Sequence, residues 1–180
     1  MVAFFWHAIV EDSNDVWRAG PEISWATLLW TPLIGVAFGL AVVVAFRWLE
    51  PRQPWISELG GEFRSIFGRP RLRELFLLAA ASSLGEELLF RGAMLDAWGL
   101  WLSSLVFAAL HLPPKRTLWP WTLSSFILGV ALGLLTLLTH NLGAAVAAHF
   151  VINLLNLHYI TRGEEASASR VEVRVGLLRV

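Results

Sequence analysis

The sequence predicts an all-α, polytopic membrane protein with about five transmembrane helices. Hydrophobic residues make up 56% of its 180 positions and charged residues only 16%, whereas a soluble domain carries about a quarter charged residues. The apolar residues fall in long runs, which is typical of a chain that crosses a bilayer. Several tryptophans flank these runs, where amphipathic rings prefer the membrane–water interface: Trp25, Trp48, Trp98, Trp119 and Trp121.

Five apolar stretches follow one another within residues 24–160, which we interpret as one membrane domain. The third stretch is short and ends at Pro113-Pro114, because proline removes a helical donor and restricts the residue before it. A polar, arginine-rich connector, residues 50–71, follows the first stretch. The expected spans are 24–49, 72–95, 98–112, 118–138 and 142–159.

The two ends of the chain are expected to lie outside this domain. The apolar run 1–10 is too short to cross a bilayer and acidic residues follow it, so residues 1–23 are interpreted as an interfacial N-terminal segment. Residues 161–180 begin with polar residues and are interpreted as a tail.

The placement of basic residues predicts the orientation. Six arginines lie in residues 47–73, Lys115 and Arg116 lie in the loop after the third stretch, and four arginines lie in the tail. With five crossings all of these fall on one side, and the opposite side holds only Arg18. The positive-inside rule therefore predicts an N-terminus outside and a cytoplasmic C-terminus.

Composition also excludes several classes of function. The formal net charge is zero, so no strongly basic surface indicates a nucleic-acid partner. Cysteine is absent, which rules out disulfides, a thiol nucleophile and a thiolate zinc site. Composition thus predicts the lipid bilayer as a partner, and the motifs described below add a protein or peptide substrate at the membrane.

The second apolar stretch contains the segment Glu86-Glu87-Leu88-Leu89-Phe90-Arg91. Ionisable groups at membrane depth are costly and indicate function by default. Glu87 and Arg91 are spaced i, i+4 with the acid first, the favoured order for a helical ion pair, so a structural role is favoured for this pair. Glu86 points about 100° away on the helix and has no local cation, which suits it to accept a proton from water.

Two further apolar stretches carry polar side chains. His111 ends the third stretch, where a histidine alone is typical of a membrane interface. His149 and Asn153 are four residues apart and share one face of the fifth stretch, where hydrogen bonding between helices is the alternative to catalysis. Together with Glu86, these residues include the groups that amide hydrolysis requires, namely a base for water and donors for the oxyanion.

At these positions the sequence resembles the CAAX protease and bacteriocin-processing family, also called the Abi family. The family pattern is EExxxR, then FxxxH, then HxxxN, matched here from Glu86 to Arg91, from Phe107 to His111 and from His149 to Asn153. The resemblance implies a glutamic-type intramembrane endopeptidase that trims a C-terminal tail or a CAAX-like sequence. It implies water activation by Glu86 with His111, an oxyanion hole of His149 and Asn153, and Glu87 and Arg91 in support. A chain this short is expected in a bacterial plasma membrane.

The same residues allow alternative interpretations of the cofactor and of the function. No cofactor is expected, because the HExxH helix of zinc membrane proteases is absent and asparagine is a poor zinc ligand. The alternative is a zinc ion held by Glu86, His111 and His149. The alternative function is a non-catalytic membrane scaffold or a bacteriocin-immunity-like protein. A small transporter is disfavoured because no inverted repeat is visible.

Overall fold

The computed structural model describes residues 15–18, 23–113 and 115–177, and this part of the chain is all-helical. Residues 1–14, 19–22 and 178–180, which include most of the expected interfacial segment, lie outside the described residues. The main helices are α2 (Trp25–Leu49), α3 (Pro54–Phe67), α4 (Leu72–Glu87), α5 (Leu95–Ala109), α6 (Trp119–Thr139) and α7 (Gly143–Leu177). A π-helical segment, η2 (Leu88–Met94), joins α4 to α5, and short 3-10 turns lie at Glu50–Arg52 and Arg116–Leu118.

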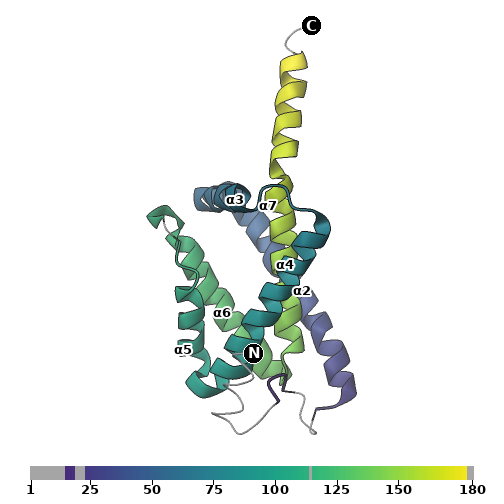
Figure 1. Cartoon of the computed structure of the whole chain (residues 1–180), viewed down its shortest axis with the longest axis vertical. Coiled ribbons are helices and arrows are strands. Elements are labelled where there is room, and N and C mark those ends of the chain that lie inside the picture. The colour runs from purple at the N-terminus through teal and green to yellow at the C-terminus, as the bar shows by residue number, and fades with distance from the viewer. Residues whose placement is uncertain (1–14, 19–22, 114, 178–180) are drawn as a thin grey trace.

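Four helical stretches of the described chain are long and apolar enough to cross a membrane: Trp25–Arg52, Leu72–Ala109, Arg116–Thr139 and Gly143–Arg162. The second has 38 residues and would reach about 57 Å if straight, roughly twice the thickness of the hydrocarbon core. It is broken at Gly99, where φ is 75° and ψ is 174°, a conformation open essentially to glycine alone. Figure 1 shows α4 and α5 as two separate limbs. The prediction of an all-α membrane protein with about five segments is therefore confirmed, and its orientation stays a prediction.

The connector between the first two spans contains a helix that was not predicted from the sequence. In α3, Pro54 occupies the first turn and Gly68 follows the last residue with a φ of 61°, the arrangement that favours helix start and stop. Trp55, Leu59 and Phe63 recur every four residues, which gives the helix one apolar face. Helix α3 lies across one end of the bundle (Figure 1).

Helix α7 forms the centre of the bundle and contacts α2, α3, α4 and α6. Its closest approach is to α2, where a Cβ atom on Gly35 would lie 2.0 Å from the carbonyl oxygen of Ala144. A Cβ atom on Gly39, one turn later, would lie 2.8 Å from the carbonyl oxygen of Ala148. Small residues spaced by four allow such backbone contact in membranes. The backbone of α7 continues as a helix through the region that we interpreted as a tail.

Residues 15–18 pack against the end of the bundle where α4 turns into α5. Val16 is 1% exposed, and a Cβ atom on Gly92 would lie 2.5 Å from its side chain. Arg18 pairs with Asp96, and the amide of Leu142 donates to the carbonyl oxygen of Trp17 at 3.2 Å. This short segment thus ties the π-helical turn to the start of α7.

Candidate active site

The paired glutamates at the end of α4 enter different environments. The side chain of Glu86 is 33% exposed, whereas that of Glu87 is fully buried. Successive helical residues point about 100° apart, so the two carboxylates diverge. Glu86 faces a cleft, while Glu87 faces the interior of the helix bundle.

The carboxylate of Glu87 accepts hydrogen bonds from two buried side chains, the guanidinium of Arg91 and the imidazole of His149. Its Oε1 atom lies 2.9 Å from Nη1 of Arg91 and 2.7 Å from Nδ1 of His149. The second guanidinium nitrogen of Arg91 donates to the carbonyl oxygen of Gly129 on α6 at 3.1 Å. Arg91 lies in the π-helical segment η2, so this network joins α4, η2, α6 and α7. π-Helical segments are rare and are frequent at functional sites. The contact between Glu87 and His149 was not predicted from the sequence.

Glu86, His111 and His149 converge on the wall of the cleft. The Oε2 atom of Glu86 lies 3.9 Å from Nε2 of His111 and 3.8 Å from Nε2 of His149. Among the described residues, this oxygen has no hydrogen-bond partner. The distances exceed a direct hydrogen bond and suit a bridging water. Because Oε2 is buried, a small movement of the Glu86 side chain has to open this atom to the cleft before water can reach it.

Phe107 fixes the orientation of His111. Its carbonyl oxygen lies 2.8 Å from Nδ1 of His111, and since a carbonyl only accepts, Nδ1 carries the proton. The two rings are 4.5 Å apart, and the guanidinium carbon of Arg91 lies 4.4 Å from the centre of the Phe107 ring. In the neutral imidazole, Nε2 of His111 is therefore left as an acceptor facing Glu86.

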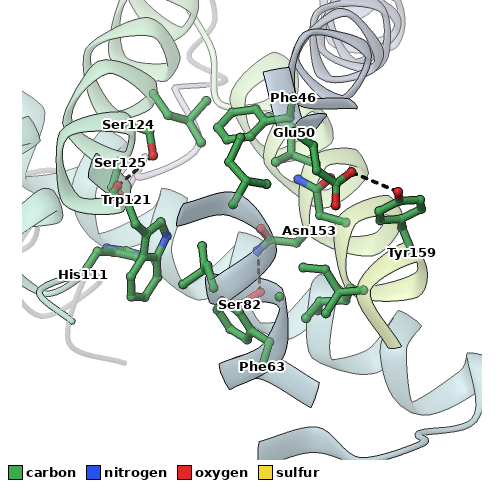
Figure 2. Close-up of a pocket in the computed structure, with 18 of the residues that line it drawn as sticks. Phe46, Glu50, Phe63, Ser82, His111, Trp121, Ser124, Ser125, Asn153 and Tyr159 are labelled. Atoms are coloured by element: carbon green, nitrogen blue, oxygen red, sulfur yellow. Dashed lines mark hydrogen bonds between the residues drawn. The ribbon is translucent and has the colours of Figure 1, made fainter. Parts of the chain in front are cut away.

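Asn153 lines the same cleft one turn after His149, but within the described ranges its side chain forms no hydrogen bond with Glu86, His111 or His149. Its Nδ2 atom instead donates to Oγ of Ser82 on α4 at 3.0 Å. This contact is drawn in Figure 2. Ser82 has no recognisable nucleophile motif, and the sequence offered no signal for its contact with Asn153.

The cleft has a volume of about 610 Å³ and is lined by residues of α2, α3, α4, α5, α6 and α7. The apolar face of α3 forms one wall, with Trp55, Leu59 and Phe63. Figure 2 shows His111 with Trp121 on one side of the cleft, and Glu50 with Tyr159 on another. The site is thus an aromatic-rich hollow, with the Glu86 carboxylate and two imidazoles together on one part of its wall.

The outer side of α3 is held to the loop between α5 and α6. Oγ1 of Thr117 contacts Oε1 of Glu58 at 2.9 Å, and Lys115 forms an ion pair with Glu62. The hydrogen bond from Lys115 to Glu62 raises the pKa of the lysine. These contacts fix α3 over the cleft from the side of α6.

Comparison with known proteins adds the family to this geometry. Residues 69–155 match the family described as type II CAAX prenyl endopeptidase Rce1-like. The chain is also similar to the uncharacterized protein YpbD of Bacillus subtilis (strain 168), with 31% identity over 149 residues that cover 79% of this chain and 74% of that protein. The chain belongs to the Rce1-like CAAX endopeptidase family. No solved structure gave a significant match.

The Rce1-like family is a family of proteases that process peptides at membranes. The apolar helices and the family agree that it is an integral membrane protein. The matched residues begin just before α4 and end within α7, so they contain every predicted site residue. Helices α2 and α3 lie before the match, which places part of the cleft wall outside it.

The zinc alternative concerns the same residues. Within the ranges that the structure describes, no group of three His, Asp or Glu side chains has an arrangement that could hold a metal ion. The two imidazoles and Glu86 do converge, and Nδ1 of His149 is engaged by Glu87 as in many metal-ligating histidines. Chelation of the purified protein therefore tests the zinc alternative.

Proposed function

We propose that this chain is a glutamic-type intramembrane endopeptidase in which Glu86 activates water to hydrolyse a peptide bond near the membrane. The observation that carries this proposal is the position of Oε2 of Glu86, 3.8 to 3.9 Å from the Nε2 atoms of His149 and His111 at the wall of the cleft. A general base has to lie within hydrogen-bond reach of the proton that it removes.

In the proposed reaction, one water molecule donates hydrogen bonds to Glu86 and to Nε2 of His111, each at about 2.8 Å. The water oxygen attacks the peptide carbonyl carbon while Glu86 takes one water proton. The tetrahedral intermediate then collapses, the C–N bond breaks, and Glu86 returns the proton to the leaving amine. The products are a new carboxyl terminus and a new amino terminus, with no covalent enzyme intermediate.

His149 and Asn153 are proposed as the donors to the oxyanion. The carboxylate of Glu87 only accepts, so Nδ1 of His149 donates to it. A donor role also requires a proton on Nε2, so the proposed form of His149 is the doubly protonated imidazolium, whose Nε2 donates into the cleft. One hydrogen of the Asn153 amide is held by Ser82, which leaves the other for the oxyanion. Two such donors aimed at the developing charge are the usual means of stabilising it.

The substrate is proposed to be a C-terminal tail or a CAAX-like segment that enters the cleft beneath α3. The basic residues of the connector lie at the same end of the bundle as α3, which by the positive-inside rule is the cytoplasmic end. We place the protein in a bacterial plasma membrane. No metal is included, because a carboxylate base and two donors suffice for the reaction.

Isotope labelling tests the water mechanism. The full chain in liposomes is given a prenylated CAAX-type peptide with a fluorophore and quencher on either side of the expected cleavage site, here called the reporter peptide. A single turnover in ¹⁸O-water should place one ¹⁸O in the new carboxyl terminus and none in Glu86. Incorporation of ¹⁸O into Glu86 would instead mean that the glutamate attacks the peptide directly, and an uncleaved reporter would count against the proposed substrate class.

A further inference from the structure

Ser82 lies on α4, the helix that carries the proposed general base Glu86, and its side chain contacts α7. It lies four residues before Glu86, on the same helical face, and both side chains line the cleft. Its Oγ atom donates to the carbonyl oxygen of Ala79 at 3.2 Å and accepts from Nδ2 of Asn153 at 3.0 Å. Figure 2 shows this bond crossing between the two helices.

We propose that Ser82 is a positioning residue that sets which end of the Asn153 amide faces the cleft. The inference rests on the proposed function, in which Asn153 donates to the oxyanion. It adds a residue that acts only through Asn153 and that does not touch the reacting atoms.

The argument follows from the number of protons on a hydroxyl group. A serine hydroxyl has one donor and two lone pairs. Since the Ser82 hydrogen is committed to Ala79, the side that faces α7 carries only lone pairs. The amide nitrogen of Asn153 can meet those lone pairs, whereas the amide oxygen would repel them. The flipped amide is therefore disfavoured, and the second Nδ2 hydrogen is held toward the cleft.

Without this contact, the Asn153 amide would lose its fixed orientation. The terminal torsion of asparagine is broad and roughly two-fold, so a flipped amide would present an acceptor to the oxyanion. Misplacement of a catalytic group by about 1 Å can cost a hundredfold in rate. Substrate affinity should change little, because the oxyanion forms only in the transition state.

The neighbouring Ser83 provides a matched control. Its Oγ atom makes the same bond within the helix, to the carbonyl oxygen of Ala80 at 3.2 Å. No side chain of the described residues bonds to Ser83, which is 1% exposed. Replacement of Ser83 by alanine thus removes a hydroxyl from the same helix without releasing Asn153.

The first experiment measures cleavage of the reporter peptide per inserted molecule of the full chain in liposomes. We expect Ser82→Ala to lower kcat about tenfold or more with KM nearly unchanged, and Ser83→Ala to stay near the wild-type rate. Ser82→Thr retains the hydroxyl group, whereas Ser82→Val introduces a side chain of the same shape as threonine but without the hydroxyl. The threonine variant should therefore keep more activity than the valine variant. Equal rates for Thr and Val would overturn the proposal, even if Ser82→Ala inserts poorly.

A double-mutant cycle separates this proposal from the proposed function. In an Asn153→Ala background, Ser82→Ala should cause no further loss, because its only path to the reaction has been removed. Losses that multiply would overturn the positioning role and leave the proposed function intact. An Asn153→Ala variant with the wild-type rate would instead remove the oxyanion assignment itself, and with it the basis for positioning by Ser82.

Discussion

Nδ1 of His149 lies 2.7 Å from Oε1 of Glu87, and the same oxygen also accepts from Arg91. Glu87 therefore has two roles: it neutralises Arg91 at membrane depth, and it orients His149 of the candidate site. All three side chains are at most 4% exposed. Removal of one member leaves the others in a medium where an unpaired charge is costly.

Glu87→Gln should mainly reduce the amount of inserted protein. The substitution leaves Arg91 without its counter-charge, and breaking a buried ion pair costs about 3–5 kcal/mol. Glu62→Gln is the control, because Glu62 pairs with the half-exposed Lys115 and such surface pairs are worth about 1 kcal/mol or less. Quantitative immunoblotting of membrane fractions measures both variants, and wild-type abundance of Glu87→Gln would show that the buried pair does not stabilise the fold.

Asn153→Ala should lower the cleavage rate by about a hundredfold or more, the usual effect of losing one oxyanion donor. KM for the reporter peptide should change far less than kcat, since the interaction forms in the transition state. Asn156→Ala is the control, because this amide lines the cleft nearly one turn further along α7 and should cause a much smaller loss. Equal losses in the two variants would argue for a general role in shaping the cleft.

Chelators should leave proteolysis intact. The proposed reaction draws its base and its donors from Glu86, His111, His149 and Asn153, so prolonged dialysis against EDTA or 1,10-phenanthroline should not change the cleavage rate. A rate that falls on chelation and returns on addition of zinc would restore the metalloprotease alternative.

The orientation can be measured on this naturally cysteine-free chain. A single cysteine at Ser24, the exposed N-cap of α2, should react with a membrane-impermeant maleimide in intact cells. A cysteine at the exposed Ser57 of α3 should react only after the membrane is permeabilised. The reverse pattern would contradict the orientation inferred from the basic residues.

The sequence identified the spans and the three motifs because both depend on local patterns. Apolar runs determine where a helix can cross a bilayer, and a glutamate inside such a run is visible without any structure. Helix α3 was missed because its proline, its two adjacent glycines and its arginine are also typical of a loop. Its apolar period of four residues, from Trp55 to Phe63, was the available signal.

The contacts that organise the site could not be read from spacing. Glu87 and His149 are 62 residues apart in sequence, and Ser82 and Asn153 are 71 apart. Such pairs depend on how α4 and α7 pack, and the i, i+4 pair with Arg91 already accounted for Glu87. The π-helical segment around Arg91 likewise has no sequence signature that we recognise.

The most direct test of glutamate-activated hydrolysis is the Glu86→Gln variant. Glutamine keeps the shape and the hydrogen-bonding capacity of the side chain but does not accept the water proton, so cleavage of the reporter peptide should be abolished. The variant should still insert at the wild-type level, because Glu86 has no ion-pair partner closer than 3.8 Å among the described residues. A Glu86→Gln protein that cleaves the reporter at the wild-type rate would contradict the account.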